Sequence, residues 1–201
     1  MFKSKFITFE GIEGVGKTTQ VRLLCDLFKK QNIDFVSTRE PGGLPISESI
    51  RNILLHKDMS PITELLLYEA ARAEHFDKIV HPALEKGQSV ICDRFTDASV
   101  AYQGYGRGLE IKLIEELNNI ATKNKEPDLT FIIDLPVKLA FERLSKRGTA
   151  PDRFEKLSHE FYEKVRTGYI EQSKKYPKRV IIIDANRTPE QIHKDIVSNI
   201  S

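Results

Sequence analysis

The sequence predicts an α/β fold in which a parallel sheet is covered by helices on both faces, and three observations point to it. Short, continuously apolar segments recur along the 201-residue chain, as is typical of strands buried on both sides. Segments with helical spacing of apolar residues separate them. A glycine-rich segment directly follows the first apolar one, at the strand end where such sheets bind ligands. Without a repeat or a Pro/Gly-rich linker, we expect one domain over 1–201.

The expected elements follow from local patterns. The first strand, 5–10, is rich in β-branched and aromatic residues, and the first helix carries Val21, Leu24, Leu27 and Phe28 at helical spacing. A Pro-Gly-Gly turn closes the second strand, and Pro61 opens the longest helical stretch. We expect strands at 5–10, 33–38, 89–92, 129–134 and 179–184. We expect helices near 17–30, 47–56, 61–86, 110–123, 136–146, 157–176 and 189–199.

Composition excludes several classes of protein. Charged residues make up 30% and hydrophobic residues 40% of the chain, and the net charge of +2 is too small to argue for a nucleic-acid partner. No apolar run approaches the roughly 20 residues of a membrane helix, and the amino terminus has no signal-peptide core. Cys25 and Cys92 fall in helix and strand patterns, so we expect buried free thiols in a reducing cytosol. The sequence predicts a cytoplasmic protein with no membrane partner.

The segment Gly11–Thr18 fits G-x-x-x-x-G-K-[ST], the phosphate-binding loop, in its confirming position between a strand and a helix. Glycines let backbone N–H groups turn inward, and the helix dipole favours the same phosphates. Lys17 would bridge the β- and γ-phosphates, and the Thr18 hydroxyl would ligate Mg²⁺. The expected ATP-binding residues here are Gly11, Ile12, Glu13, Gly14, Val15, Gly16, Lys17, Thr18 and Thr19.

Two strand ends carry arginines. Asp93 and Arg94 follow the apolar strand at 89–92. An acidic residue beside a phosphate loop commonly binds the metal, directly or through water, and an arginine can donate two hydrogen bonds to a second phosphate. Arg39 ends the second strand, before Pro41-Gly42-Gly43, and would point into the same crevice. A strand-end salt bridge and a bland loop arginine are the structural alternatives. Together, Arg39 and Arg94 indicate a clamp for a second phosphorylated substrate.

Base-reading candidates come from two further segments. Tyr68 and Arg72 lie four residues apart on one helix face, where a ring could stack on a base and an arginine could bond a base edge. A core tyrosine with a surface arginine is the alternative. Ser99, Tyr102 and Gln103 belong to the glycine-punctuated stretch 93–108, which could read a base or form an ordinary turn. His75 and His81 lack a cluster of metal-ligating partners and are expected to be structural or solvated.

The interval 143–155 loses its apolar period, and we expect a mobile flap, or lid. Arg143, Arg147 and Arg153 lie in it, and three such side chains suit charge neutralisation during phosphoryl transfer, although a solvated basic loop is equally consistent. Asn124-Lys125-Glu126-Pro127 resembles the guanine-reading N-K-x-D of GTPases but has a proline in place of the aspartate. This departure counts against a GTPase switch.

With these motifs together, the chain resembles the bacterial thymidylate kinases from end to end. The matching segments are Phe9–Gly14 with its phosphate loop, Thr38–Gly43, Leu65–His75, Asp93–Phe95 and Ala101–Gly104. The resemblance implies a P-loop NTPase fold with a five-stranded parallel sheet, transfer of a phosphoryl group from ATP to dTMP with Mg²⁺, and a homodimer. Two departures stand out: Tyr68 replaces the usual phenylalanine, and Leu44 replaces a common threonine.

Position by position, the resemblance implies the following roles. Arg39 and Arg94 hold the dTMP phosphate, Arg72 reads thymine and Tyr68 stacks on it. Ser99 and Gln103 line the base edge. The Tyr102 ring packs close to the sugar and disfavours a 2′-hydroxyl, and Glu13 lies near the 3′-hydroxyl and the metal. Since Val15 leaves the phosphate loop without an arginine, the catalytic arginine comes from the lid, as Arg147 or Arg153, while Arg143 packs near adenine.

Two other functions remain open at this point. A deoxynucleoside kinase shares a phosphate loop and an Asp-Arg-aromatic segment, but its acceptor hydroxyl needs an acidic base and little positive charge. A nucleotide-gated binding switch would hydrolyse ATP or GTP slowly and signal to a partner protein. Arg39 facing Arg94 argues against the first, and the arginine-rich lid and incomplete N-K-x-D argue against the second.

Overall fold

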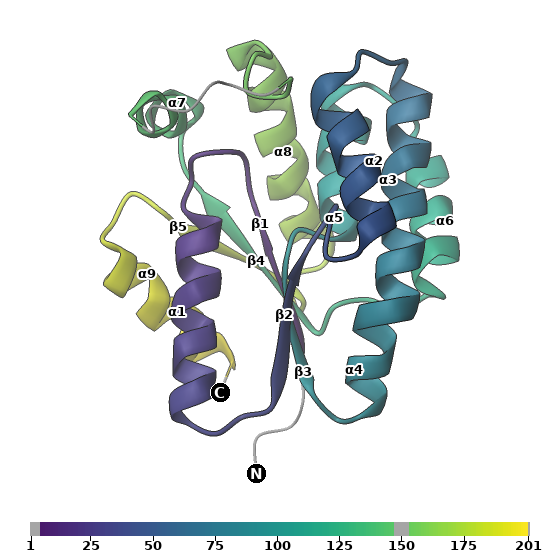
Figure 1. Cartoon of the computed structure of the whole chain (residues 1–201). Helices are drawn as coiled ribbons and strands as arrows, with labels where there is room; N and C mark the ends of the chain where they lie inside the picture. The colour runs from purple at the N-terminus through teal and green to yellow at the C-terminus, as the bar shows by residue number, and fades with distance from the viewer. Residues whose placement is uncertain (1–4, 147–152, 201) are drawn as a thin grey trace.

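The computed structural model describes residues 5–146 and 153–200, which form a five-stranded parallel sheet flanked by helices (Figure 1). The strands pair in the order β2-β3-β1-β4-β5, all parallel. Their bounds are β1 (Phe6–Glu10), β2 (Phe35–Arg39), β3 (Ser89–Asp93), β4 (Leu129–Asp134) and β5 (Val180–Asp184). The predicted α/β class and parallel sheet are confirmed, because each apolar run became a strand within two residues of its expected start.

The strand order brings the predicted polar strand ends together. In the register, Asp93 of β3 lies beside Phe9 of β1 on one side and Arg39 of β2 on the other. Parallel strands all end at the same sheet edge, so the loops after β1, β2 and β3 open into one region. This edge is at the top of Figure 1, where the loop from β1 to α1 turns over.

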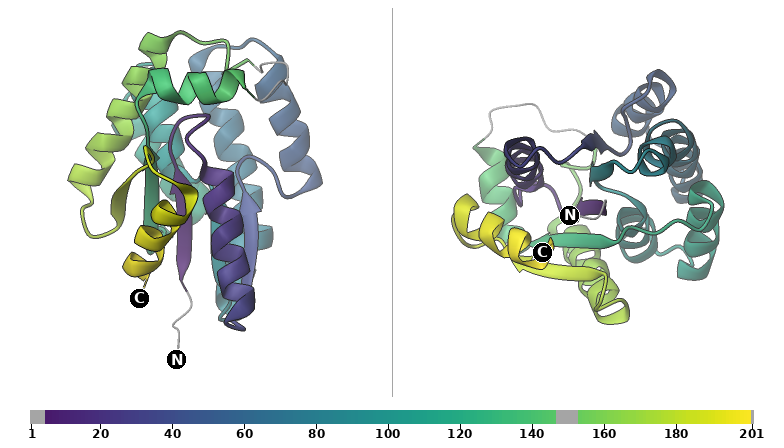
Figure 2. Two further views of the ribbon diagram at one scale, coloured as in Figure 1. Left: turned by 90° about the vertical axis from the view of Figure 1, so that its left-hand side faces the viewer. Right: turned by 90° about the horizontal axis from the view of Figure 1, so that it is seen from below.

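Helices cover both faces of the sheet. The α1 and α9 helices pack on one face, and the α3–α4 stretch, α6 and α8 lie on the other (Figure 2). The helix bounds are α1 (Lys17–Lys30), α2 (Pro45–His56), α3 (Pro61–His75), α4 (His81–Glu85), α5 (Thr96–Ser99), α6 (Ile111–Thr122), α7 (Val137–Ser145), α8 (His159–Lys175) and α9 (Pro189–Ile200). Two π-helical segments, η1 (Phe76–Val80) and η2 (Val100–Gly106), join α3 to α4 and extend α5.

The stretch 93–108, for which the sequence left a base-reading segment and an ordinary turn as alternatives, is helical over most of its length. Its glycines serve close packing. A Cβ on Gly106 would lie 2.7 Å from the ring of Phe161 in α8, and one on Gly104 would collide with Ile111 of α6. Small residues let η2 lie directly against both helices, so these glycines mark close packing and not a turn.

The core supports this edge from below. The five residues of β1 are all buried, and Cys25 and Cys92 are buried free thiols, as predicted. His75 is buried and hydrogen-bonded to Glu40 and Thr38, which confirms a structural role.

Among the described residues, no helix combines the length and the apolar character needed to cross a bilayer.

Candidate active site

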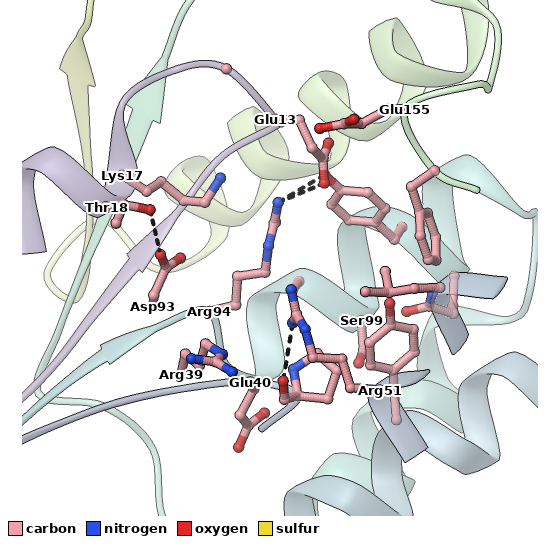
Figure 3. A pocket seen from close by; sticks show the side chains of 18 of the residues that line it. Glu13, Lys17, Thr18, Arg39, Glu40, Arg51, Asp93, Arg94, Ser99 and Glu155 are labelled. Atoms are coloured by element: carbon pink, nitrogen blue, oxygen red, sulfur yellow. Dashed lines mark hydrogen bonds and ion pairs between the residues drawn. The ribbon is translucent and has the colours of Figure 1, made fainter. Parts of the chain in front are cut away.

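A cavity of about 330 Å³ opens at the carboxyl edge of β1, β2 and β3 (Figure 3). Residues from the phosphate loop form one end, residues at and after the ends of β2 and β3 form the middle, and residues of α3, η2 and the last part of the predicted lid form the other end. The described residues that line it are Glu13, Gly14, Gly16, Lys17, Thr18, Thr19, Arg39, Glu40, Pro41, Arg51, Leu55, Tyr68, Asp93, Arg94, Ala98, Ser99, Tyr102, Gln103, Phe154 and Glu155.

The phosphate-loop end has the features of an anion site. Gly16 adopts a φ of 104° before α1, and none of the described side chains caps the first turn of that helix, so its N–H groups face the cavity. The Nζ atom of Lys17 donates to the carbonyl oxygens of Gly11 at 2.9 Å and Ile12 at 2.8 Å. Burial, with the nearby positive charge of Arg94, lowers the pKa of Lys17 to about 8. An anion bound here would stabilise the charged amine and raise its pKa again.

Arg94 faces the same space as Lys17 (Figure 3). Its Nη2 donates to Glu13 Oε1 at 2.8 Å and to the Tyr102 hydroxyl at 3.2 Å, while its Nη1 donates to Gly11 O at 3.0 Å. Burial opposes its charge, yet Tyr102 and Glu13 hold its pKa well above the usual value. Arg94 is therefore a fixed cation between the two ends of the cavity.

A carboxylate and a phenol complete this cluster. The Tyr102 hydroxyl donates to Glu13 Oε2 at 2.6 Å, and burial raises the Tyr102 pKa well above its usual value, so it remains a donor. Burial would raise the pKa of Glu13, but Arg94 and Lys17 lower it below the usual value. Glu13 is thus ionised and bonded through both oxygens, with Arg94 on one and Tyr102 on the other.

Two further arginines line the cavity. Arg39 is half-exposed and donates from Nη2 to Glu48 Oε1 at 2.7 Å. Arg51 of α2, which the sequence analysis missed, donates from Nη1 to the carbonyl oxygen of Pro41 at 3.1 Å. Glu48 and Arg51 lie three residues apart on α2, and this charged pair beside the Pro-Gly-Gly turn was the available signal. Arg51 therefore joins the predicted pair, and three arginines, Arg39, Arg51 and Arg94, line the cavity.

At the far end, Tyr68, Ser99, Gln103 and Phe154 line the cavity, and the rings of Tyr68 and Phe154 meet edge to face at 6.3 Å. Arg72 lies behind this wall and is only 2% exposed. Its guanidinium donates to Glu40, Glu69, Ser99, Asn118 and the carbonyl oxygen of Phe95. Arg72 is not among the lining residues, and its base-reading role stays a prediction.

Arg143 and Arg153, the predicted lid arginines within the described residues, donate hydrogen bonds to the residue after β5 and to α2 and α3. Arg153 donates from Nε to Leu54 O at 2.8 Å and from Nη2 to Glu64 Oε2 at 2.6 Å, which directs it toward α2 and α3. Arg143 donates to the carbonyl oxygen of Ala185 at 3.0 Å, beyond β5. Arg147 is one of the residues 147–152 of the predicted lid, 143–155, that lie outside the described residues. The roles of all three stay predictions.

Oxygen donors suited to Mg²⁺ meet beside the phosphate loop. The Thr18 hydroxyl donates to Asp93 Oδ2 at 3.3 Å, and both residues line the cavity next to Lys17. A hydroxyl and a carboxylate fit Mg²⁺, which takes few protein ligands and completes its shell with phosphate oxygens and water. Within the described ranges, no group of three or more His, Cys, Asp or Glu side chains converges as an all-protein metal site.

Comparisons with known proteins show the family of this chain. The family model described as Thymidylate kinase matches residues 9–196. The chain belongs to the thymidylate kinase family. It is 48% identical over 189 residues to the thymidylate kinase of Citrifermentans bemidjiense, covering 90% of this chain and 84% of that one. It is 44% identical over 198 residues to that of Pelotomaculum thermopropionicum, covering 97% and 92%.

A solved structure of the same family has the same fold. The crystal structure of thymidylate kinase from Ehrlichia chaffeensis superposes with a TM-score of 0.81 at 38% identity, covering 99% of each chain. Membership of the thymidylate kinase family makes the chain an enzyme, a phosphotransferase with the P-loop NTPase fold. The deoxynucleoside kinase and the binding switch that the motifs left open are not the families matched.

Proposed function

We propose that this chain transfers the γ-phosphoryl group of ATP to the 5′-phosphate of dTMP, giving ADP and dTDP for dTTP synthesis. The observation that carries the proposal is that the phosphate loop and Arg94 face one cavity, with Arg39 and Arg51 beside them. Two anion sites in one cavity suit a reaction between two phosphorylated substrates. The reaction needs positioning and charge stabilisation rather than covalent chemistry.

The donor site consists of the loop amides, Lys17 and the first turn of α1. Their positive potential would hold the β- and γ-phosphates of ATP and stabilise the charge that spreads over the transferred group. Thr18 and Asp93 would hold Mg²⁺, which when bound neutralises phosphate charge. Arg143, beside the Ala185 carbonyl, would pack near adenine.

The acceptor site consists of Arg94, Arg39 and Arg51. A nucleoside acceptor would need a carboxylate as base, and in two of the carboxylates that line the cavity both oxygens already accept a hydrogen bond. Glu13 accepts from Arg94 and Tyr102, and Glu40 from Arg72 and His75. A phosphate acceptor is already an oxyanion and needs no such base, so this arrangement favours a monophosphate substrate.

Nucleoside recognition would occur at the far end. Tyr68 would stack on the thymine ring, Ser99 and Gln103 would line its edge, and Arg72 would bond it after exchanging one of its present partners. Tyr102, fixed by Glu13 and Arg94, would crowd the sugar and exclude a 2′-hydroxyl. For the lid, we propose that Arg147 or Arg153 supplies the catalytic guanidinium when ATP is bound; Arg153 would then have to leave Glu64.

We also propose a homodimer. The family resemblance suggests it, and exposed apolar side chains support a surface for a second copy. Ile62 and Leu66 on α3 and Leu113 and Ile120 on α6 are between 37% and 75% exposed, on two helices that pack together.

A coupled assay of ADP release tests the proposed reaction. Purified enzyme with Mg²⁺-ATP is given dTMP, thymidine, dCMP, GMP or no acceptor. We expect turnover with dTMP to exceed the others by at least about two orders of magnitude, as hydrogen-bonded recognition of a base allows. Comparable turnover with thymidine would instead support a deoxynucleoside kinase. ADP release that no acceptor accelerates would leave only an ATPase.

A further inference from the structure

Arg94 has an unusual backbone. Its φ is 72°, in the left-handed region that residues with a Cβ avoid, and the other non-glycine residues with positive φ in the described ranges, Asn32, Lys123 and Asn124, lie at helix ends. At the end of β3, this conformation turns the side chain back across β1 toward the phosphate loop. Something in the surrounding fold must therefore hold residues 94 and 95 in place.

Glu10, the last residue of β1, provides that restraint. Its Oε1 accepts the N–H of Phe95 at 2.7 Å, and the N–H of Arg94 itself donates to the carbonyl oxygen of Phe9 at 2.9 Å. Glu10 has no exposed surface and does not line the cavity, so substrates cannot reach it. A buried carboxylate on a backbone amide is a strong restraint, because leaving that group unbonded is costly.

Tyr169 of α8 connects this carboxylate to the guanidinium. Its hydroxyl donates to Glu10 Oε2 at 2.8 Å and accepts from Arg94 Nη1 at 3.1 Å. Burial raises the Tyr169 pKa well above its usual value, so the hydroxyl keeps its proton and the chain of hydrogen bonds runs from Arg94 to Tyr169 to Glu10. Tyr169 is 2% exposed and, like Glu10, lies behind the cavity wall.

We propose that Tyr169 is a positioning residue which, anchored by Glu10, fixes the guanidinium of Arg94 for the acceptor phosphate. The contact ties α8, the helix that follows the predicted lid, to the acceptor half of the site. Tyr102 and Glu13 both accept from the other terminal nitrogen of Arg94, Nη2, and are bonded to each other, so the guanidinium lies between two phenol–carboxylate pairs. The inference rests on the proposed role of Arg94 in binding dTMP.

The test uses Tyr169→Phe, which removes the hydroxyl and keeps the buried ring. Tyr176→Phe, at the end of the same helix and remote from Arg94, is the matched control. Assays are run at pH 8, where Glu10 is ionised, since burial raises its pKa to about 7. We expect Tyr169→Phe to lower kcat/KM for dTMP about tenfold, as for one lost hydrogen bond to a charged group, with KM for ATP changed less than about twofold. Tyr176→Phe should match the wild type.

The double variant Arg94→Lys/Tyr169→Phe separates positioning from packing. If Tyr169 acts through Arg94, adding Tyr169→Phe to the Arg94→Lys variant should lower kcat/KM for dTMP by less than about twofold. A tenfold decrease in that variant would overturn the inference. So would a Tyr169→Phe single variant in which kcat/KM falls equally for dTMP and for ATP. Normal kcat/KM for dTMP in Tyr169→Phe would also overturn it while leaving the proposed function intact. A wild-type enzyme that does not phosphorylate dTMP would instead refute the proposed function.

Discussion

Replacement of Lys17 by methionine should inactivate the enzyme and stabilise its ligand-free fold. Methionine keeps the aliphatic chain but has neither the charge nor the donors that would meet the β- and γ-phosphates. Removing one preorganised charge-stabilising group typically costs about 100- to 1,000-fold in kcat, and we expect a loss in that range. The stability of the ligand-free protein should increase, because the charged amine of Lys17 is buried there without the anion that the site would bind.

The size of the stability change follows from the pKa. Burial, with the repulsion of Arg94, lowers the Lys17 pKa from 10.5 to about 8. One pKa unit corresponds to about 1.4 kcal/mol, so the charged amine lowers the free energy of unfolding of the ligand-free protein by about 3 kcal/mol at pH 7. The lost hydrogen bonds to Gly11 O and Ile12 O offset about 1 to 2 kcal/mol of the gain. A net gain of about 1 kcal/mol raises Tm by roughly 3 °C in a domain of this size.

The stability difference between the two proteins should depend on pH. Between pH 8 and pH 10.5 the unfolded chain keeps a proton on Lys17 that the folded chain has lost, so wild-type stability rises with pH across that window. The variant has no such group, and its advantage should be greatest below pH 8 and should disappear toward pH 10.5.

Differential scanning fluorimetry at pH 7 and pH 9.5, with steady-state kinetics at pH 7.5, measures both effects. Lys29→Met, an exposed lysine on the same helix, is the control and should leave both Tm and kcat unchanged. A Lys17→Met variant with normal turnover would remove Lys17 from the chemistry. A variant that melts below the wild type at pH 7 would refute the argument that burial disfavours the charged amine.

Four further outcomes are expected. Tyr102→Ala should narrow the preference for dTMP over its ribonucleotide analogue by about tenfold, since a ring that crowds the sugar is lost; an unchanged ratio would remove Tyr102 from sugar selection. Arg51→Met should raise KM for dTMP about tenfold with KM for ATP unchanged, and equal changes in both would place Arg51 outside the acceptor site. Asp93→Asn should raise the Mg²⁺ concentration for half-maximal activity about tenfold, and an unaltered Mg²⁺ titration would contradict its metal role. Ile120→Glu should yield a monomer in sedimentation velocity at micromolar protein, whereas a monomeric wild type would refute the dimer.

The parts of the fold that the sequence predicted correctly depend on local patterns. The phosphate loop requires its glycines, lysine and flanking strand within a few residues, and continuous apolar runs distinguish buried parallel strands. The stretch 93–108 was ambiguous because glycine marks both turns and close packing, and only the neighbours of Gly104 and Gly106 decide between them.

Site residues were harder to predict where their role depends on distant partners. Arg72 was paired with Tyr68 by helical spacing, but its burial is set by Glu40, Ser99 and Asn118, which come from three other segments. Arg51 was missed because no short motif links α2 to the turn after β2. Glu10 was seen only as part of a strand, since its contacts with Phe95 and Tyr169 span 85 and 159 residues of sequence.

The tight packing of η2 has a consequence for attempts to broaden the range of nucleotides that the enzyme accepts. Tyr102 and Gln103 belong to the π-helical segment η2, where a Cβ on Gly106 would press on the Phe161 ring of α8 and one on Gly104 on the end of the Ile111 side chain of α6. Insertions or deletions there would disturb two neighbouring helices as well as the cavity. Engineering should therefore exchange side chains at fixed backbone positions, and libraries that vary loop length belong elsewhere on the molecule.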